Sequence, residues 1–313
     1  MLAVLVGIVG ALVYGSADFI GGLAAKRISA LRVTALGGFS GLVLLLILLP
    51  FIGGTWSWSA VLLGGLSGIS GALAVSLLYA CLAIGPMSVL SPITALVSAV
   101  VPVLAGVIRG ERLSSLGYVA ILVALVAVVL VGFVPEKGSI RPSPQALAMA
   151  FGAGTLIGVF LILIDLTPSD SRLVPLILNR TVNTIVMFSA IAVLWLVSRR
   201  STTRRNARGV DVAGAPNSGA QPTRTSVAAG GTWRPGLVLA LVGGVTDALA
   251  NAVLLLGLRI GELTIQSVLT ALYPAGTIIL AAFVLKERIA KVQIVGMVLA
   301  LVAAAMLAAT MWR

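Results

Sequence analysis

Long apolar runs separated by short polar segments make up most of the chain, and they predict about ten membrane-spanning helices. Each run is close to the roughly 20 residues that a helix needs to cross the hydrocarbon core of a bilayer. The runs do not alternate between apolar and polar residues, which argues against transmembrane strands. The predicted spans cover residues 3–24, 32–50, 59–82, 86–108, 116–134, 145–164, 175–197, 236–257, 262–284 and 291–311. The predicted fold class is therefore an all-α integral membrane protein.

One segment departs from this pattern. Residues 198–234 are rich in Arg, Ser, Thr, Gly and Pro and hold almost no large apolar side chains. Such a stretch buries too little apolar surface to offset the entropy lost on ordering it, so we expect a flexible loop. Its arginines either set the topology or contact the lipid surface. The chain therefore has two predicted units. The first covers residues 1–134, and the second covers residues 145–197 and 235–313 and is interrupted by the loop.

A repeated stretch relates these two units. Residues 84–112 read IGPMSVLSPITALVSAVVPVLAGVIRGER, and residues 260–288 read IGELTIQSVLTALYPAGTIILAAFVLKER. At a constant offset of 176, 11 of the 29 positions are identical, including the closing Glu-Arg pair. Each unit has five predicted helices, an odd number, so the second is inverted relative to the first. Inverted repeats are typical of transporters that work by alternating access.

Composition supports a membrane location and excludes several chemistries. The mean hydropathy is +1.16 and 10% of the residues are charged, and no soluble domain of this length buries so much apolar side chain. Cys81 is the only cysteine, so an internal disulfide is excluded, and the chain has no His for a proton relay or a metal site. We expect no cofactor, no metal and no nucleic-acid partner.

Charge predicts the orientation in the membrane. The net charge of +12 resides mainly in loops, and positive-inside topology explains it more simply than nucleic-acid binding does. The loops on one side carry 15 Lys and Arg, and the other side carries 6, with Arg180 counted among them. The first side is expected to be cytoplasmic. Loop 198–234 would then be cytoplasmic, and both termini would lie outside the plasma membrane.

Two carboxylates fall well inside predicted spans. Asp247 lies near the middle of the eighth span, with Asn251 one turn further on, and Asp18 shares a face of the first span with Tyr14. An ionisable group at this depth costs a few kcal/mol, so it normally faces a cavity or a partner and marks a substrate or proton path. Asp247 and Asp18 are therefore the candidates for proton coupling. The alternative is a protonated or hydrogen-bonded structural carboxyl group.

A polar face runs along the ninth span. Gln266, Thr270, Tyr273 and Thr277 recur at intervals of four, three and four residues, which places them on one side of a helix. Such a face either lines a cavity or bonds a neighbouring helix. For the larger Gln266 and Tyr273 we expect the cavity. Pro274 lacks a backbone N–H, so it should break the helix beside Tyr273.

Small residues and the two Glu-Arg pairs carry further expectations. Glycines spaced along the third and sixth spans predict close helix packing. They are Gly64, Gly65, Gly68 and Gly71 in the third span and Gly154 and Gly158 in the sixth. The Glu-Arg pairs at residues 111–112 and 287–288 act either as gates or as interfacial anchors, because an arginine there can extend to the headgroups.

Several motifs together resemble the EamA-type transporters of the drug/metabolite transporter superfamily. They are Tyr14-Gly15-Ser16, Gly-Pro-x-Ser-x-x-Ser-Pro from Gly85 to Pro92, the Glu-Arg endings, Arg32, Arg180 and Pro274. The first copy departs from the pattern, because Ser98 stands at the position that Pro274 occupies in the second. The resemblance implies a central cavity built by helices one to four and six to nine, with helices five and ten peripheral. It leaves the substrate open, because relatives carry amino acids, nucleotide sugars, purines or amphipathic drugs.

The sequence thus predicts a secondary transporter that exports a small organic solute, amino acid-like or amphipathic and cationic, with proton coupling as one possibility. The predicted substrate-binding residues are Asp247, Asn251, Tyr14, Tyr79, Gln266, Thr270 and Tyr273. Expected partners are the solute, membrane lipids and a second copy of the chain. A lipid-linked substrate flippase of the same fold is one alternative, and a channel is another. An integral-membrane enzyme is a third, although no paired carboxylates or phosphate loop support it.

Overall fold

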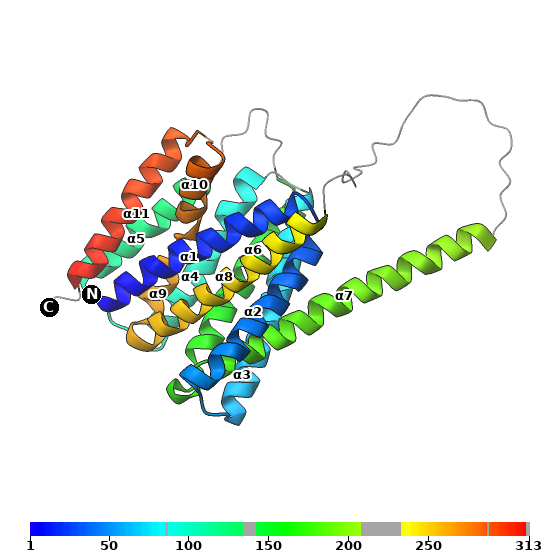
Figure 1. Cartoon of the computed structure of the whole chain (residues 1–313). Helices are drawn as coiled ribbons and strands as arrows, with labels where there is room; N and C mark the ends of the chain where they lie inside the picture. The colour runs from blue at the N-terminus through cyan, green and yellow to red at the C-terminus, as the bar shows by residue number, and fades with distance from the viewer. Residues whose placement is uncertain (85–86, 134–141, 208–232, 287, 311–313) are drawn as a thin grey trace.

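The computed structural model describes residues 1–84, 87–133, 142–207, 233–286 and 288–310. Within these residues, ten helical spans are long and apolar enough to cross a membrane, which confirms the predicted all-α fold (Figure 1). The helices are α1 (Leu2–Ala25), α2 (Ala30–Ile52), α3 (Trp58–Ile84), α4 (Met87–Ile108), α5 (Ser115–Gly132), α6 (Pro144–Asp165), the short η1 (Ser169–Ser171), α7 (Val174–Ala207), α8 (Trp233–Ile260), α9 (Leu263–Thr270), α10 (Tyr273–Val284) and α11 (Lys291–Thr310).

The two five-helix units are inverted relative to each other. The side chain of Glu111, just beyond α4, bonds the first residues of α9, so α4 ends where its counterpart begins. Helix α1 begins and α11 ends at this same end of the bundle (Figure 1). We call it the terminal end. The inverted arrangement predicted from the odd number of helices is therefore confirmed.

The ninth span is broken, as Pro274 predicted. Helix α9 stops at Thr270, and α10 begins at Tyr273 with Pro274 in its first turn, where a missing N–H costs least. Between them the N–H of Leu272 turns back to the carbonyl of Leu269, at 3.1 Å. The break lies inside the span Leu263–Val284, so the helical hydrogen-bond ladder is interrupted at membrane depth.

Glycine allows close contact between several helices. A methyl group added to Gly64 or Gly68 on α3 would lie 2.6 Å from a carbonyl oxygen of α7, and one added to Gly154 on α6 would lie 2.6 Å from the Thr94 carbonyl of α4. Gly158 meets α4 just as closely. The predicted close packing holds for these positions. Gly65 and Gly71 have more room, at 3.9 and 3.8 Å from the nearest atoms of α7.

Helix α7 corrects one predicted boundary. Its membrane span ends at Val197, as predicted, but the helix continues to Ala207, into the predicted loop 198–234, and projects beyond the rest of the bundle (Figure 1). The first glycine of the polar segment is Gly209, and arginine is a good helix former, so nothing in residues 198–207 breaks the helix. The remainder of the predicted flexible loop falls mostly on residues 208–232, which lie outside the described residues.

Two apolar clusters organise the bundle. The first joins α4, α5, α9, α11 and the start of α1, with Ala99, Val128, Leu269 and Leu307 among its buried members. Helices α5 and α11 pair at one edge, the peripheral position that the resemblance implied (Figure 1). The second cluster joins α2, α6, α7 and α8, and Tyr14 of α1 packs against it. Many large apolar side chains remain on the outer surface, where lipid would cover them.

Candidate functional site

An ion pair lies inside the bundle, between α7 and α8. The guanidinium of Arg180 donates to the carboxylate of Asp247, and their side chains are only 11% and 33% exposed. Gly41 on α2 lies beside it, since a methyl group there would be in ordinary contact with Nε of Arg180, at 3.7 Å. Charges at this depth are normally paired with each other, because neither is solvated by lipid. Asp247 therefore carries a charge that is already compensated.

Arg180 lies deeper in the membrane than the sequence predicts. The pattern of loop charges puts it among the basic residues at the membrane surface, and the family resemblance gives it only as a motif residue. It lies within the span Val174–Val197, about 9 Å along α7 from the start of the helix at the usual rise. The available signal was its position inside an apolar run in a chain with an opposite charge, Asp247, in another run. Arg180 is the member of the candidate site that the sequence did not single out as a site residue.

Asn251 connects Asp247 to the first helix. Its Oδ1 accepts a hydrogen bond from the hydroxyl of Tyr14 at 2.8 Å, and its Nδ2 donates to the backbone carbonyl of Asp247 at 2.8 Å. Asn251 is buried, so both ends of the amide are satisfied inside the protein. The structure thus brings together three residues that the sequence named: Tyr14, Asp247 and Asn251. With Asp18 and Arg180 they form what we call the central polar cluster.

Asp18 completes this cluster and differs from Asp247 in one respect. It lies one turn from Tyr14 on α1 and interacts electrostatically with Asp247 and with Tyr273. Its side chain is exposed, and among the described residues it has no hydrogen-bond or ion-pair partner. Two carboxylates and one guanidinium leave one negative charge uncompensated when all three are ionised. Asp18 is the group that bears it.

Helix α10 forms a wall beside Asp18. A methyl group on Gly15 of α1 would lie 2.5 Å from the backbone oxygen of Tyr273, so the two backbones touch at the break in the ninth span. The hydroxyl of Thr277 donates to the carbonyl of Gly15 at 3.2 Å, which fixes α10 on α1. Tyr273 therefore lies close to the central polar cluster, whereas Thr277 bonds a neighbouring helix.

The other predicted site residues lie elsewhere or are not described. Gln266 is fully buried at the terminal end, where its Nε2 donates to the carbonyl of Ala3 at 2.8 Å and its Oε1 has no partner. The structure does not bring it to Tyr14, which lies three turns further along α1. Thr270 ends α9 and is half-buried. The side chain of Tyr79 lies outside what the structure describes.

A second polar site occupies the terminal end. The two carboxylate oxygens of Glu111 accept the backbone N–H groups of Leu263 and Thr264, at 2.9 and 3.0 Å. Glu262, just before α9, lies beside them. Desolvation raises the pKa of Glu262, and the negative charge of Glu111 raises it further. Residue 287, the equivalent of Glu111 in the second copy, lies outside the described residues.

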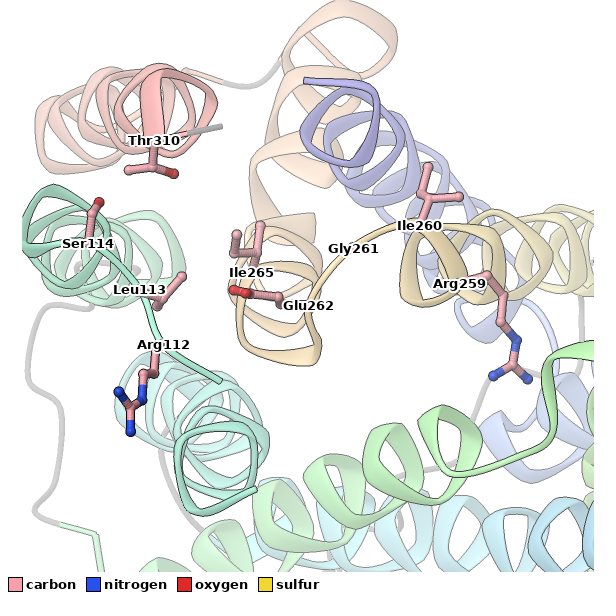
Figure 2. A pocket seen from close by; sticks show the side chains of 9 residues that line it. All are labelled: Arg112, Leu113, Ser114, Arg259, Ile260, Gly261, Glu262, Ile265 and Thr310. Atoms are coloured by element: carbon pink, nitrogen blue, oxygen red, sulfur yellow. The ribbon is translucent and has the colours of Figure 1, made fainter. Parts of the chain in front are cut away.

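A cavity of about 440 Å³ opens beside this contact (Figure 2). Glu262 and Ile265 project into it from the start of α9, with Arg112 on one side and Arg259 on the other. The guanidinium of Arg259 is held by the α6–α7 connection, where Nη1 donates to the carbonyl of Thr167 at 2.7 Å. Arg112, by contrast, is exposed.

Ten spans in two inverted halves, with a charged cluster between helices of both, are the architecture of a multi-pass membrane transporter. The chain belongs to the EamA-like transporter family, whose model matches residues 1–133 and 218–309. The first matched segment covers the first unit, and the second covers α8 to α11 of the second unit. The family is one of transporters rather than enzymes.

No curated protein matches the chain, and the remaining comparison concerns the fold. One solved structure, described only as the crystal structure of a protein, is similar with a TM-score of 0.70 and 14% sequence identity, over 98% of this chain and 98% of that one. At that identity the likeness shows the fold alone. It extends over both inverted units.

Proposed function

We propose that this protein is a secondary transporter that exports a small cationic organic solute in exchange for a proton, by alternating access. The observation that carries the proposal is the pairing of Asp247 with Arg180, which leaves Asp18 as the uncompensated carboxylate of the central polar cluster. A negative charge at membrane depth attracts a cation strongly, because lipid does not solvate it. The cation is either a proton or the solute.

This competition supplies the coupling. If Asp18 binds the solute's cationic group only when it is deprotonated, loading of the solute and loading of the proton exclude each other. An inward proton gradient then drives the solute outward, and linkage makes solute affinity fall as protons are added. The sequence favours Asp247 as the proton site. We favour Asp18 instead, because the guanidinium of Arg180 already compensates the charge of Asp247. Tyr14 and Tyr273 beside Asp18 suit an amphipathic cation, since aromatic faces attract positive charge.

An amino acid-like zwitterion is the competing solute class. Its carboxylate would need Arg180, and its ammonium would need a carboxylate, so it would have to open the Arg180–Asp247 pair. A cation needs neither change, which is why we favour it.

The proposed orientation follows from the positions of the basic residues. Arg180 no longer counts as a surface charge at the terminal end. The arginine-rich extension of α7 projects from the opposite end, so that end is proposed to be cytoplasmic and the termini extracytoplasmic. The membrane is proposed to be the plasma membrane.

The experiment compares binding of two probes to purified protein at several pH values. Tetraphenylphosphonium represents an amphipathic cation, and phenylalanine represents a zwitterion. We expect tetraphenylphosphonium binding to weaken at low pH, and Asp18→Asn to abolish both the tight binding and its pH dependence. Ser16→Ala is the matched control, because among the described residues the Ser16 hydroxyl bonds the Leu12 carbonyl of its own helix and no other group.

Two outcomes would contradict the proposal. If Asp18→Asn keeps pH-dependent binding and Asp247→Asn loses it, the coupling belongs to α8. If phenylalanine binds and tetraphenylphosphonium does not, the solute class is wrong.

A further inference from the structure

We propose that Glu111 is a latch that holds the terminal end of the transport path closed, by tying the end of α4 in the first repeat to the start of α9 in the second. This inference rests on the alternating access proposed above, because a latch has meaning only in a protein whose two ends open in turn.

The geometry of the contact is specific. Each oxygen of the Glu111 carboxylate accepts one backbone N–H, from Leu263 at 2.9 Å and from Thr264 at 3.0 Å. These N–H groups belong to the first turn of α9, which has no partners of its own for them and carries the positive end of the helix dipole. Hydrogen bonds to a charged acceptor are stronger than neutral ones. The carboxylate thus joins two helices that are not neighbours in the chain.

Gly106 makes the contact possible. The chain turns back after α4, where the N–H of Glu111 bonds the carbonyl of Gly106 at 3.0 Å, so the carboxylate lies directly over this glycine. A methyl group at Gly106 would overlap both the Glu111 carboxylate and Oγ1 of Thr264. A side chain at residue 106 would therefore push the carboxylate away from α9.

The contacts of Glu111 fit a latch better than an interfacial anchor. An anchoring residue extends to the headgroups, as the exposed Arg112 can, whereas Glu111 turns toward another helix. Beyond the contact, Leu269 of α9 and Ala99 of α4 belong to the first apolar cluster. Directly outside it lies the 440 Å³ cavity lined by Glu262 and Ile265 (Figure 2). The latch thus stands between a water-accessible vestibule and a sealed layer of side chains.

Electrostatic repulsion between Glu111 and Glu262 would keep the contact reversible. Glu262 is close enough for the charge of Glu111 to raise its pKa, so the two carboxylates oppose each other when both are ionised. The backbone hydrogen bonds outweigh this repulsion in the closed arrangement. Once α9 moves away, the repulsion favours keeping the two groups apart.

The test measures how often the terminal end opens. Ser267 on α9 is 1% exposed and lies one turn beyond the latched residues, so Ser267→Cys reports access to the sealed layer. Cys81→Ser removes the native thiol, and the labelling rate with a maleimide is followed in lipid nanodiscs. We expect Glu111→Ala to raise the rate at least about tenfold, since it removes two charge-assisted hydrogen bonds from the closed state only. Arg112→Gln, the adjacent control, should leave the rate unchanged.

Two further variants keep the outcome decisive. Ser70→Cys is a reporter of unfolding, because Ser70 is 5% exposed and its hydroxyl bonds the Leu156 carbonyl of α6, a helix that the latch does not join. If Glu111→Ala raises labelling at residue 70 as well, the variant has unfolded, and Gly106→Ala replaces it. A rise at residue 267 alone in either variant supports the latch. An unchanged rate at residue 267 in a folded Glu111→Ala or Gly106→Ala variant overturns it. Because no solute is used, the latch and the Asp18 exchange can fail separately.

Discussion

At the scale of single residues, some members of the candidate site can be recognised in the sequence, and others only from the way the helices pack. Asp18, Asp247 and Asn251 stand out in the sequence because polar groups inside apolar runs are costly and need a reason. Arg180 does not stand out, because it is near the start of its span and resembles an interfacial arginine. Its partnership with Asp247 depends on how α7 and α8 pack, which no local pattern encodes.

The ion pair predicts an asymmetric response to mutation. Arg180→Gln leaves Asp247 without its counter-charge, and breaking one side of a buried pair costs about 3–5 kcal/mol in dry interiors. Because Asp247 is 33% exposed, we expect about 2 kcal/mol here and a lower Tm in detergent. The double variant Arg180→Gln with Asp247→Asn should recover most of the loss. A double variant less stable than Arg180→Gln would show that the two groups do not compensate each other.

Gln266 yields a second prediction at this scale. The sequence favoured a cavity-lining role, but its amide is buried and tied to the Ala3 carbonyl. Gln266→Leu should therefore lower the Tm while leaving tetraphenylphosphonium affinity unchanged. Tyr273→Ala should do the reverse, weakening affinity with a smaller effect on Tm. Reduced affinity in Gln266→Leu at an unchanged Tm would return this residue to the binding site.

At the scale of helices, proline and glycine were informative, and the polar segment was partly misleading. Pro274 predicted the break between α9 and α10 because it removes a backbone donor. The sequence predicts a loop from residue 198, whereas α7 continues to Ala207, because an arginine-rich segment without apolar residues still forms a helix when it lacks glycine and proline. Glycine spacing predicted close packing in α3 but not which glycines face α7, since that depends on how the helix is rotated.

Two glycines of α3 provide a matched pair. A methyl group on Gly68 would lie 2.6 Å from the Asn179 carbonyl, whereas one on Gly71 would lie 3.8 Å from the nearest atom, on Asn183. Gly68→Ala must separate α3 from α7 and should cost about 1–3 kcal/mol of stability, as overpacking does in cores. Gly71→Ala should be neutral or slightly stabilising, because alanine is the better helix former. Thermal unfolding of both variants in the same detergent compares them, and equal Tm values would contradict the close α3–α7 packing.

At the scale of the whole molecule, the repeat predicts the inverted architecture but cannot say which end is closed. The two copies are alike in sequence, so either end could carry the sealed contact, and only the structure places Glu111 against α9. The orientation of that end across the membrane is a separate question. It depends on loop charge, which the sequence supplies directly.

Orientation is tested with two single-cysteine proteins in a Cys81→Ser background. Ser115 begins α5 at the terminal end, and Ser29 precedes α2 at the opposite end, and both are exposed. Moving Arg180 into the membrane leaves 15 basic residues on the Ser29 side and 5 on the Ser115 side, which strengthens the asymmetry. In intact cells an impermeant maleimide should therefore label Ser115→Cys, and should reach Ser29→Cys only after permeabilisation. The reverse pattern would place the Glu111 contact on the cytoplasmic side. The latch would then close the side from which an exported solute is loaded, and a proton entering from outside would reach Asp18 without passing it.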